Sequence, residues 1–371
     1  MTNTATSNGS NGAAPAATLP TQFDAEKAHQ FVGKVVTDCA ATVSLTLAVI
    51  GDQLGLYRAL AGGAQLTSAE VAERAGVSER YVREWLINQA SAGYLDYDAQ
   101  AERYSLPPER AVALLNEESP FYVGGALMIA LAMTKAEPRI RESFRTGAGM
   151  GWGEHDPYMW EGCERLFRPG YLANLTQSWI PALDGAQAKL ERGATVADIG
   201  CGHGASTLIM AQAYPNSRFF GFDAHPASIE HANALAREAG IADRVAFAVG
   251  TGTNYPGVGY DLVAYFDCLH DMGDPAESIR HTRQALAPDG VVMLVEPAAG
   301  AHVEENFNPV GQFYSGASVL VCTPNALATG AEALGTVATD DALAAVIHKG
   351  GLSRFRRVLT TPLNRIFEAR I

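Results

Sequence analysis

The chain has 371 residues, of which 47% are apolar, and this is enough for two domains with sizeable cores. Its formal net charge of −13 disfavours a nucleic-acid-binding surface, because such a surface needs a basic face. Its five cysteines are scattered and form no C-x-x-C pair, which favours reduced thiols in the cytoplasm over a disulfide framework or a metal site.

The N-terminal region divides into a polar tail and a long apolar segment. Residues 1–20 are rich in small and polar residues, which predicts a disordered tail. Apolar residues then recur at helical spacing over residues 23–60, which is consistent with a homodimer through this region or with an intrachain core. The most apolar run, residues 121–134, is shorter than the ~20 residues that a membrane span needs. No basic residue precedes Lys27, so we expect neither a signal region nor a membrane anchor.

Residues 66–105 have the organisation of a winged helix-turn-helix. Thr67 or Ser68 can begin a short helix that ends at Gly76, a second helix follows Ser78, and residues 94–97 and 103–105 suggest a small β-wing. The segment 64–110 is acidic overall, so we interpret residues 21–115 as a helical dimerisation and winged-helix domain without DNA binding.

Residues 116–190 are predicted to be a mainly helical linker or substrate lid. The glycine-rich stretch 147–153 interrupts the helical pattern and is followed by aromatic residues and a histidine. Trp152, His155 and Tyr158 can therefore line or cover a substrate pocket, although a surface loop anchored by its aromatic residues fits the same pattern.

Strands and helices alternate at short intervals in residues 191–298. Strands are predicted at 195–199, 218–222, 244–249, 261–266 and, after a turn at 288–290, at 291–295. This β-α-β series predicts a mostly parallel sheet covered by helices on both faces, an α/β Rossmann-like domain over residues 191–371. Two closing strands are expected at 355–359 and 365–371.

The ends of these strands carry a glycine loop and several acids. Residues 195–204 read Thr-Val-Ala-Asp-Ile-Gly-Cys-Gly-His-Gly, a strand and tight turn that let a ligand approach the backbone closely. Asp198 favours a cationic ligand over a diphosphate at this turn, because a carboxylate repels phosphate. Asp223 follows the next strand and can bind both hydroxyls of a ribose or, alternatively, cap the helix after it.

The segment Phe266-Asp-Cys-Leu-His-Asp-Met-Gly-Asp274 makes the resemblance specific. Together with the glycine loop and the winged helix, it resembles class I S-adenosylmethionine (SAM)-dependent small-molecule O-methyltransferases, which carry His-Asp-Trp-x-Asp here; Met272 replaces the Trp. The resemblance covers about residues 25–371 and implies a seven-stranded sheet. It implies that SAM binds through Asp198, Gly200, Gly202, Gly204, Asp223, Ala224, Thr251, Gly252, Phe266 and Asp267. Thr251 stands where the family usually has an acid or amide.

The resemblance makes His270 the general base, and the chemistry agrees. A hydroxyl is a poor nucleophile until it is deprotonated, and a histidine with an ordinary pKa of ~6.5 can take that proton near neutral pH. A capping or core histidine bonded to Asp271 or Asp274 is the alternative. Further substrate-lining candidates are Glu296, Phe313 and Tyr314.

The sequence thus predicts a cytoplasmic, homodimeric methyltransferase that acts on a small molecule, most simply an aromatic or polyketide-like hydroxyl, without a metal. A SAM-dependent N- or C-methyltransferase, a SAM-binding enzyme that transfers no methyl group, and a SAM-sensing winged-helix regulator stay open as alternatives.

Overall fold

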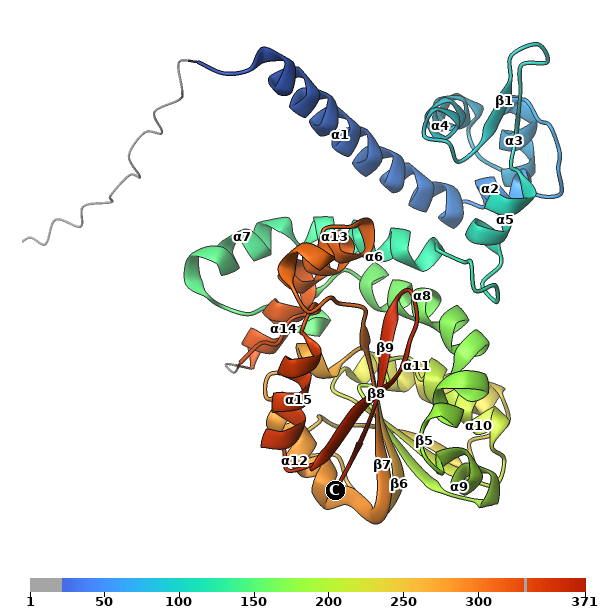
Figure 1. The fold of residues 1–371 in the computed structure, drawn as a ribbon. Coiled ribbons are helices and arrows are strands. Elements are labelled where there is room, and N and C mark those ends of the chain that lie inside the picture. The colour runs from blue at the N-terminus through green and yellow to red at the C-terminus, as the bar shows by residue number, and fades with distance from the viewer. Residues whose placement is uncertain (1–21, 330–331) are drawn as a thin grey trace, which may run out of the picture.

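The computed structural model describes residues 22–329 and 332–371, so the predicted tail at 1–20 lies outside the described residues. The N-terminal half is helical, and the C-terminal half is built around one sheet with helices on both faces (Figure 1).

The N-terminal region begins with α1 (Ala25–Gln53) and α2 (Leu56–Ala59) and continues into the winged helix-turn-helix. Thr67 begins α3 (Ser68–Ala75) with a full capping box to Glu70, and Gly76 ends it in the left-handed conformation at φ 67°. The recognition-type helix α4 (Glu79–Ser91) and the wing strands β1 (Asp96–Asp98) and β2 (Arg103–Ser105) complete this part. These elements lie where the sequence predicts them.

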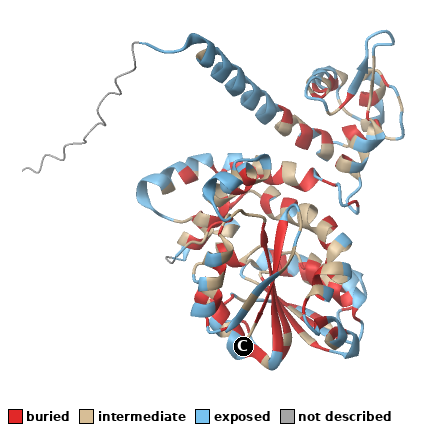
Figure 2. Ribbon diagram, viewed as in Figure 1, coloured by how far each residue is buried: buried red, intermediate tan, exposed pale blue. Residues whose placement is uncertain are grey.

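Only the last third of α1 is buried. Ser44, Ala48, Val49 and Gly51 face the rest of the protein, whereas the first two turns and the middle of the helix are exposed (Figure 2). By length and composition α1 is apolar enough to cross a membrane, a test that buried core helices and signal sequences also pass. Residues 121–134 are the most apolar run in the sequence, but α1 is the longer apolar helix, and its charged residues interrupt the run.

A helical region connects the two halves. It comprises α5 (Pro108–Leu115), α6 (Gly124–Lys135), α7 (Glu137–Thr146), the short η1 (Trp152–Glu154), α8 (Tyr158–Asn174), η2 (Leu175–Trp179) and η3 (Ile180–Ala182). Arg165 on α8 joins this region to the N-terminal part, because its guanidinium pairs with Asp52 at 2.6 Å and with Glu117 at 2.9 Å.

The sheet has seven strands in the order β5-β4-β3-β6-β7-β9-β8, all parallel except β9. The strands are β3 (Thr195–Ile199), β4 (Arg218–Asp223), β5 (Val245–Val249), β6 (Tyr260–Phe266), β7 (Leu286–Pro297), β8 (Arg354–Thr360) and β9 (Asn364–Arg370). The chain moves outward from β3 through β5 and then returns to β6. The topological switch point therefore lies between β3 and β6, where sheets of this kind bind ligands.

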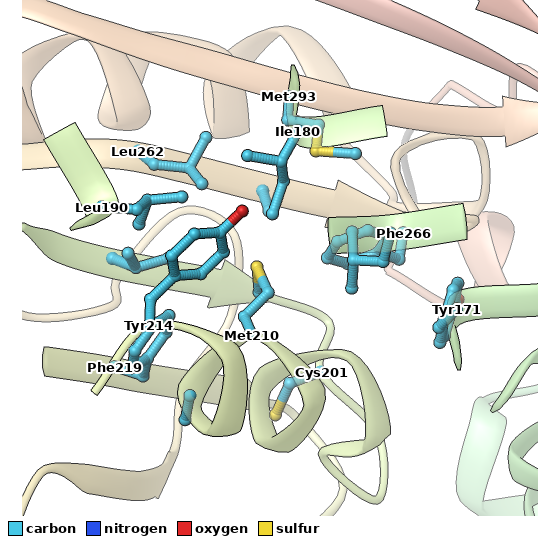
Figure 3. Packing of buried hydrophobic residues seen from close by; sticks show 14 of the residues in the cluster. Tyr171, Ile180, Leu190, Cys201, Met210, Tyr214, Phe219, Leu262, Phe266 and Met293 are labelled. Atoms are coloured by element: carbon cyan, nitrogen blue, oxygen red, sulfur yellow. The ribbon is translucent and has the colours of Figure 1, made fainter. Parts of the chain in front are cut away.

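Helices α9 (Ala186–Arg192), α10 (Ala205–Ala213), α11 (Pro226–Glu238), α12 (Pro275–Ala285) and α15 (Asp340–Lys349) accompany the sheet. The remaining elements are η4 (Leu269–Asp271), η5 (Val303–Asn306), α13 (Pro309–Ala317), η6 (Ser318–Cys322) and α14 (Thr323–Ala328). On one sheet face, Met210 of α10 and Tyr214, which directly follows this helix, pack with Leu190 and strand residues in a buried cluster (Figure 3).

One predicted boundary is wrong. The sequence predicts a turn at 288–290 before a strand at 291–295, but β7 already begins at Leu286, which pairs with Tyr260. The register then shifts, so that the next pair is Leu262 with Val291, and the intervening residues form an irregularity within the strand.

Candidate functional site

A cavity of about 820 Å³ lies at the carboxyl edge of the sheet, beside the switch point, and α8 and α14 contribute to its wall. Nine of the residues predicted to bind SAM or substrate line it: Trp152, Gly200, Gly202, Asp223, Ala224, Thr251, Gly252, Phe266 and Asp267. The structure therefore brings the ends of β3, β4, β5 and β6 together around one space.

The glycine loop forms one wall of this cavity. Gly200, Gly202 and Gly204 all have positive φ, at 71°, 52° and 81°, a conformation that other residues rarely adopt. Around Gly202 a Cβ would meet no atom of the described residues within 4 Å, so the backbone is open to a ligand. Gly204 does not line the cavity; it begins α10 and leaves room for the ring of Phe247.

Asp223 supports the glycine loop from the neighbouring strand. Its Oδ2 accepts the backbone N–H of Gly202 at 2.9 Å, and its Oδ1 accepts that of His225 at 2.8 Å. Burial raises the pKa of Asp223, and these two hydrogen bonds oppose the rise. Each carboxylate oxygen can still accept a further hydrogen bond from a ligand in the cavity.

Asp198 lies behind the cavity wall. Its Oδ2 accepts the hydroxyls of Ser206 and Thr207, each at 2.6 Å, and thereby fixes the start of α10. Its Oδ1 is buried and finds no hydrogen-bond partner in residues 22–329 and 332–371. Burial raises the pKa of Asp198 to about 6.

Two further aspartates meet the cavity at the end of β6. Asp267 adopts the left-handed conformation at φ 51°, its Oδ1 accepts from Asn364 at 2.9 Å, and its buried Oδ2 is without a partner in the described part of the chain. Burial raises the pKa of Asp267 to about 8 and that of Asp271 to about 7.

A cationic ligand fits this end of the cavity. Unpartnered carboxylate oxygens are costly to bury, and a sulfonium with an ammonium group would supply the missing charge and donors. SAM carries both groups and a ribose, so Asp267, Asp223 and the open backbone at Gly202 form a suitable set of residues to hold it.

His270 and Glu296 form a buried pair next to these aspartates. Nδ1 of His270 lies 2.6 Å from Oε2 of Glu296, and both side chains are almost fully buried. The thiol of Cys322 on η6 also lies near the imidazole. Burial lowers the pKa of His270, but the Glu296 carboxylate outweighs it, so that the pKa stands well above its ordinary value. Neither His270 nor Glu296 lines the cavity.

The segment around Trp152, which precedes α8, is bonded to α14 at the cavity wall. The side chain of Asn325 on α14 accepts the backbone N–H of Trp152 at 2.9 Å and donates to the carbonyl oxygen of Asp271 at 3.1 Å. His155 is buried, and neither ring nitrogen has a partner among the described residues. Besides Glu296, four of the predicted lining residues do not line the cavity, namely His155, Tyr158, Phe313 and Tyr314. Tyr158 and Phe313 pack in a neighbouring apolar cluster, and the Tyr314 hydroxyl donates to Leu363.

Helix α8 contributes lining residues that the sequence did not single out. Five of its residues line the cavity, namely Trp160, Cys163, Glu164, Phe167 and Tyr171. Their spacing of three or four residues marks one helix face and could have revealed them. Tyr171 also packs against Phe266, with ring centroids 5.2 Å apart.

The strand order, the antiparallel closing strand and a glycine loop bonded to an acid at the end of the neighbouring strand β4 define a class I methyltransferase fold. Two family descriptions match the chain: a Rv2258c-like winged HTH domain at residues 41–116 and a methyltransferase domain at residues 190–340. The chain therefore belongs to the class I SAM-dependent methyltransferases that carry an N-terminal winged-helix domain.

Curated relatives agree over parts of the chain. The tetracenomycin polyketide synthesis 8-O-methyl transferase TcmO of Streptomyces glaucescens is 29% identical over 276 residues, which are 68% of this chain and 77% of TcmO. The acetylserotonin O-methyltransferase of Mus musculus is 37% identical over 106 residues, 27% of each chain. For the first curated relatives the matches span only 27% to 48% of the relative's length.

Solved structures agree over nearly the whole chain. The mitomycin 7-O-methyltransferase MmcR has a TM-score of 0.71 at 21% identity, covering 93% of this chain and all of MmcR. Human N-acetylserotonin methyltransferase in complex with SAM has a TM-score of 0.67 at 16% identity, covering 95% and 99%. At this identity the likeness establishes the fold.

Proposed function

We propose that the protein transfers a methyl group from SAM to a hydroxyl of a small aromatic or polyketide-like molecule, with His270 as the general base. One observation supports this proposal most directly. The cavity lined by carboxylates and the buried His270–Glu296 pair lie together at the ends of the neighbouring strands β6 and β7. The names of TcmO and MmcR, both O-methyltransferases, support the choice of a hydroxyl acceptor.

The chemistry follows from this placement. SAM, when bound, supplies an electrophilic methyl group on a sulfonium. Asp223 accepts ribose hydroxyls, and Asp267 offers a carboxyl oxygen to the cationic end. Transfer of the methyl group to the acceptor oxygen would break the sulfur–methyl bond and release S-adenosylhomocysteine. Because Nδ1 of His270 faces Glu296, Nε2 would take the proton of the acceptor hydroxyl, and Glu296 would stabilise the imidazolium.

Aromatic side chains support an aromatic acceptor. Trp152, Trp160, Phe167, Tyr171 and Phe266 all line the cavity. Flat apolar molecules pack well between such rings, whereas a strongly hydrated acceptor would lose its water without compensation.

The winged helix contributes to architecture in this proposal and does not bind DNA. The arginines on the exposed face of α4 are already paired on the same helix, Arg80 with Glu84 at 2.5 Å and Arg83 with Glu79 at 2.9 Å. Phosphate would have to displace these carboxylates.

The same proposal includes a cytoplasmic homodimer that forms through α1. Phe31, Val32, Val35, Val36 and Val43 are large apolar residues that α1 exposes to solvent. A second copy of the chain would cover them. A reducing compartment suits the cysteines, since all five are free thiols.

Methyl-labelled SAM tests the activity. The purified protein is incubated with labelled SAM and a panel of phenolic and polyketide-type hydroxyl compounds, and products are analysed by mass spectrometry and NMR. We expect a labelled O-methyl ether. Label on nitrogen or carbon would replace the O-methyl proposal, and a changed acceptor without label would overturn methyl transfer.

A further inference from the structure

A cluster of two histidines and one glutamate lies at the rim of the cavity, outside the acceptor machinery. Glu164 comes from α8, His203 from the glycine loop and His231 from α11, and their ligand atoms all lie within 4.8 Å of one another. We propose that these three side chains form a binding site for a divalent transition-metal ion, Zn²⁺ in particular.

The donor types suit zinc. Two imidazole nitrogens and one carboxylate oxygen are the set that binds Zn²⁺ when a fourth position is left for water. The side chains of Glu164 and His203 are 23% and 8% exposed, whereas that of His231 is 47% exposed. The site is thus partly desolvated and still has an entry path through His231.

The distances suit zinc as well. Nδ1 of His203 lies 2.7 Å and Nε2 of His231 lies 3.6 Å from Oε2 of Glu164. Ligand atoms around a tetrahedral zinc are separated by about 3.3 Å, given bonds of about 2.0–2.2 Å. Small side-chain rotations are therefore enough, without a shift of α8 or α11. The imidazole rings of His203 and His231 lie close together, with centroids 4.4 Å apart and ring planes inclined at 45°.

Glu164 already has a hydrogen bond to one of the two proposed histidine ligands. Burial raises the pKa of Glu164, but the hydrogen bond from His203 and the neighbouring charges outweigh it and hold the pKa below its ordinary value. Glu164 is therefore an ionised carboxylate at neutral pH, the form that binds a metal ion.

A bound ion would tie three elements around the cavity. Glu164 and His203 both line the cavity, and His231 lies on the helix that follows Asp223. The ion would therefore hold α8 against the glycine loop at the rim.

The alternative is that Glu164 and His203 form only a hydrogen bond, which holds α8 against the glycine loop without a metal ion. His231 separates the two interpretations, because its Nε2 is too far from Glu164 for a hydrogen bond yet completes the metal site. Its exposed position on α11 also makes a substitution there compatible with folding.

Chelator-stripped full-length protein is titrated with ZnCl₂ against a chromophoric chelator, and the Co²⁺ form is examined for visible absorption. We expect one tight equivalent, weakened roughly tenfold or more by His231→Gln and by Glu164→Gln. The matched control is His302→Gln, which replaces an exposed histidine just before η5 and should bind zinc as the wild type does.

Thermal melts give a second readout. Zn²⁺ should raise the unfolding temperature of the wild-type protein and of His302→Gln, but not that of His231→Gln. Equal zinc affinity in the wild type and His231→Gln overturns the proposal. So does a loss of binding in Cys322→Ser alone, because that result assigns the metal to the separate group of His270, Asp271 and Cys322.

Discussion

Nδ1 of His270 and Oε2 of Glu296 lie 2.6 Å apart, and both side chains are almost completely withdrawn from solvent. The carboxylate fixes which nitrogen carries the shared proton and leaves the other nitrogen as the basic one. The two residues thus depend on each other for any role in proton transfer.

Replacement of His270 by alanine should lower turnover by about a hundredfold or more, because general-base catalysis is removed. SAM affinity should be nearly unchanged, since His270 does not line the cavity. Single-turnover kinetics and calorimetric SAM titration measure the two effects. Asp271→Asn is the comparison, since Asp271 does line the cavity; survival of turnover in His270→Ala with its loss in Asp271→Asn would make Asp271 the base.

The pH dependence of turnover should report the Glu296 carboxylate. The neutral imidazole is the active form, so the rate rises with pH through the raised pKa of His270. In Glu296→Gln that pKa falls, and the rising limb moves to lower pH while the plateau drops. The measurement is kcat against pH for both proteins with isotope-labelled SAM. An unmoved limb would show that Glu296 does not set the pKa of the base.

Substitution of Asp223 by asparagine should weaken SAM binding by about tenfold or more, since a hydrogen bond to a charged group contributes about 1.5–3 kcal/mol. The loss includes the support that the carboxylate gives to Gly202. Asp243→Asn, an exposed acid beyond α11, is the matched control. Calorimetry gives both affinities, and equal binding in the two variants would remove Asp223 from the site.

SAM should stabilise the protein more at pH 8.5 than at pH 6. The folded-state pKa values of Asp198, Asp271 and Asp267, about 6, 7 and 8, lie above the ordinary value of ~3.9. The stability these groups contribute is complete below that ordinary value and is lost as pH rises through 6 to 8. A sulfonium offsets the ionised carboxylates.

S-adenosylhomocysteine, which lacks the sulfonium charge, is the control for this effect. The rise in unfolding temperature that it causes should change less between pH 6 and 8.5 than the rise caused by SAM. Differential scanning fluorimetry at saturating ligand measures both. If the two ligands show the same pH dependence, the carboxyl cluster does not respond to the sulfonium.

A charge in the middle of the exposed apolar face of α1 should separate the proposed dimer. Val36→Glu places a carboxylate where a second copy would pack, whereas Gln30→Glu adds the same charge at a position that is already polar. Sedimentation equilibrium should give a monomer for the first variant and a dimer for the second. A wild-type protein that sediments as a monomer would refute the dimer itself.

The sequence could predict the sheet because its strands are short apolar runs with helices between them. It could also predict that Asp223 and Gly202 meet, since parallel strands end at one edge of the sheet. Hydrophobic periodicity could not predict the early start of β7, because this start depends on pairing between Leu286 and Tyr260. A local pattern cannot place a bulge that a neighbouring strand imposes.

The helical wall of the site, formed by α8 and the segment before it, was harder to predict from the sequence. Glu164 lies 39 residues before its partner His203, and no motif links them. Tyr314 illustrates the opposite difficulty, because an aromatic residue in a helical segment after the sheet fits a pocket as well as a core. Its hydroxyl is instead bonded to the backbone at Leu363. Motifs locate groups on adjacent strand ends, whereas the closing wall depends on how helices pack.

The single amide of Asn325 binds the backbone of Trp152 on one side and that of Asp271 on the other. Any displacement of the Trp152 segment away from the strand end must break one of these two hydrogen bonds. The position of the Trp152 segment and the backbone conformation at Asp271, next to His270, are therefore coupled through one side chain. Under the proposed function, a bulky acceptor that forces this segment outward would break a hydrogen bond that holds the backbone of Asp271, and the segment would thereby discriminate between acceptors by size.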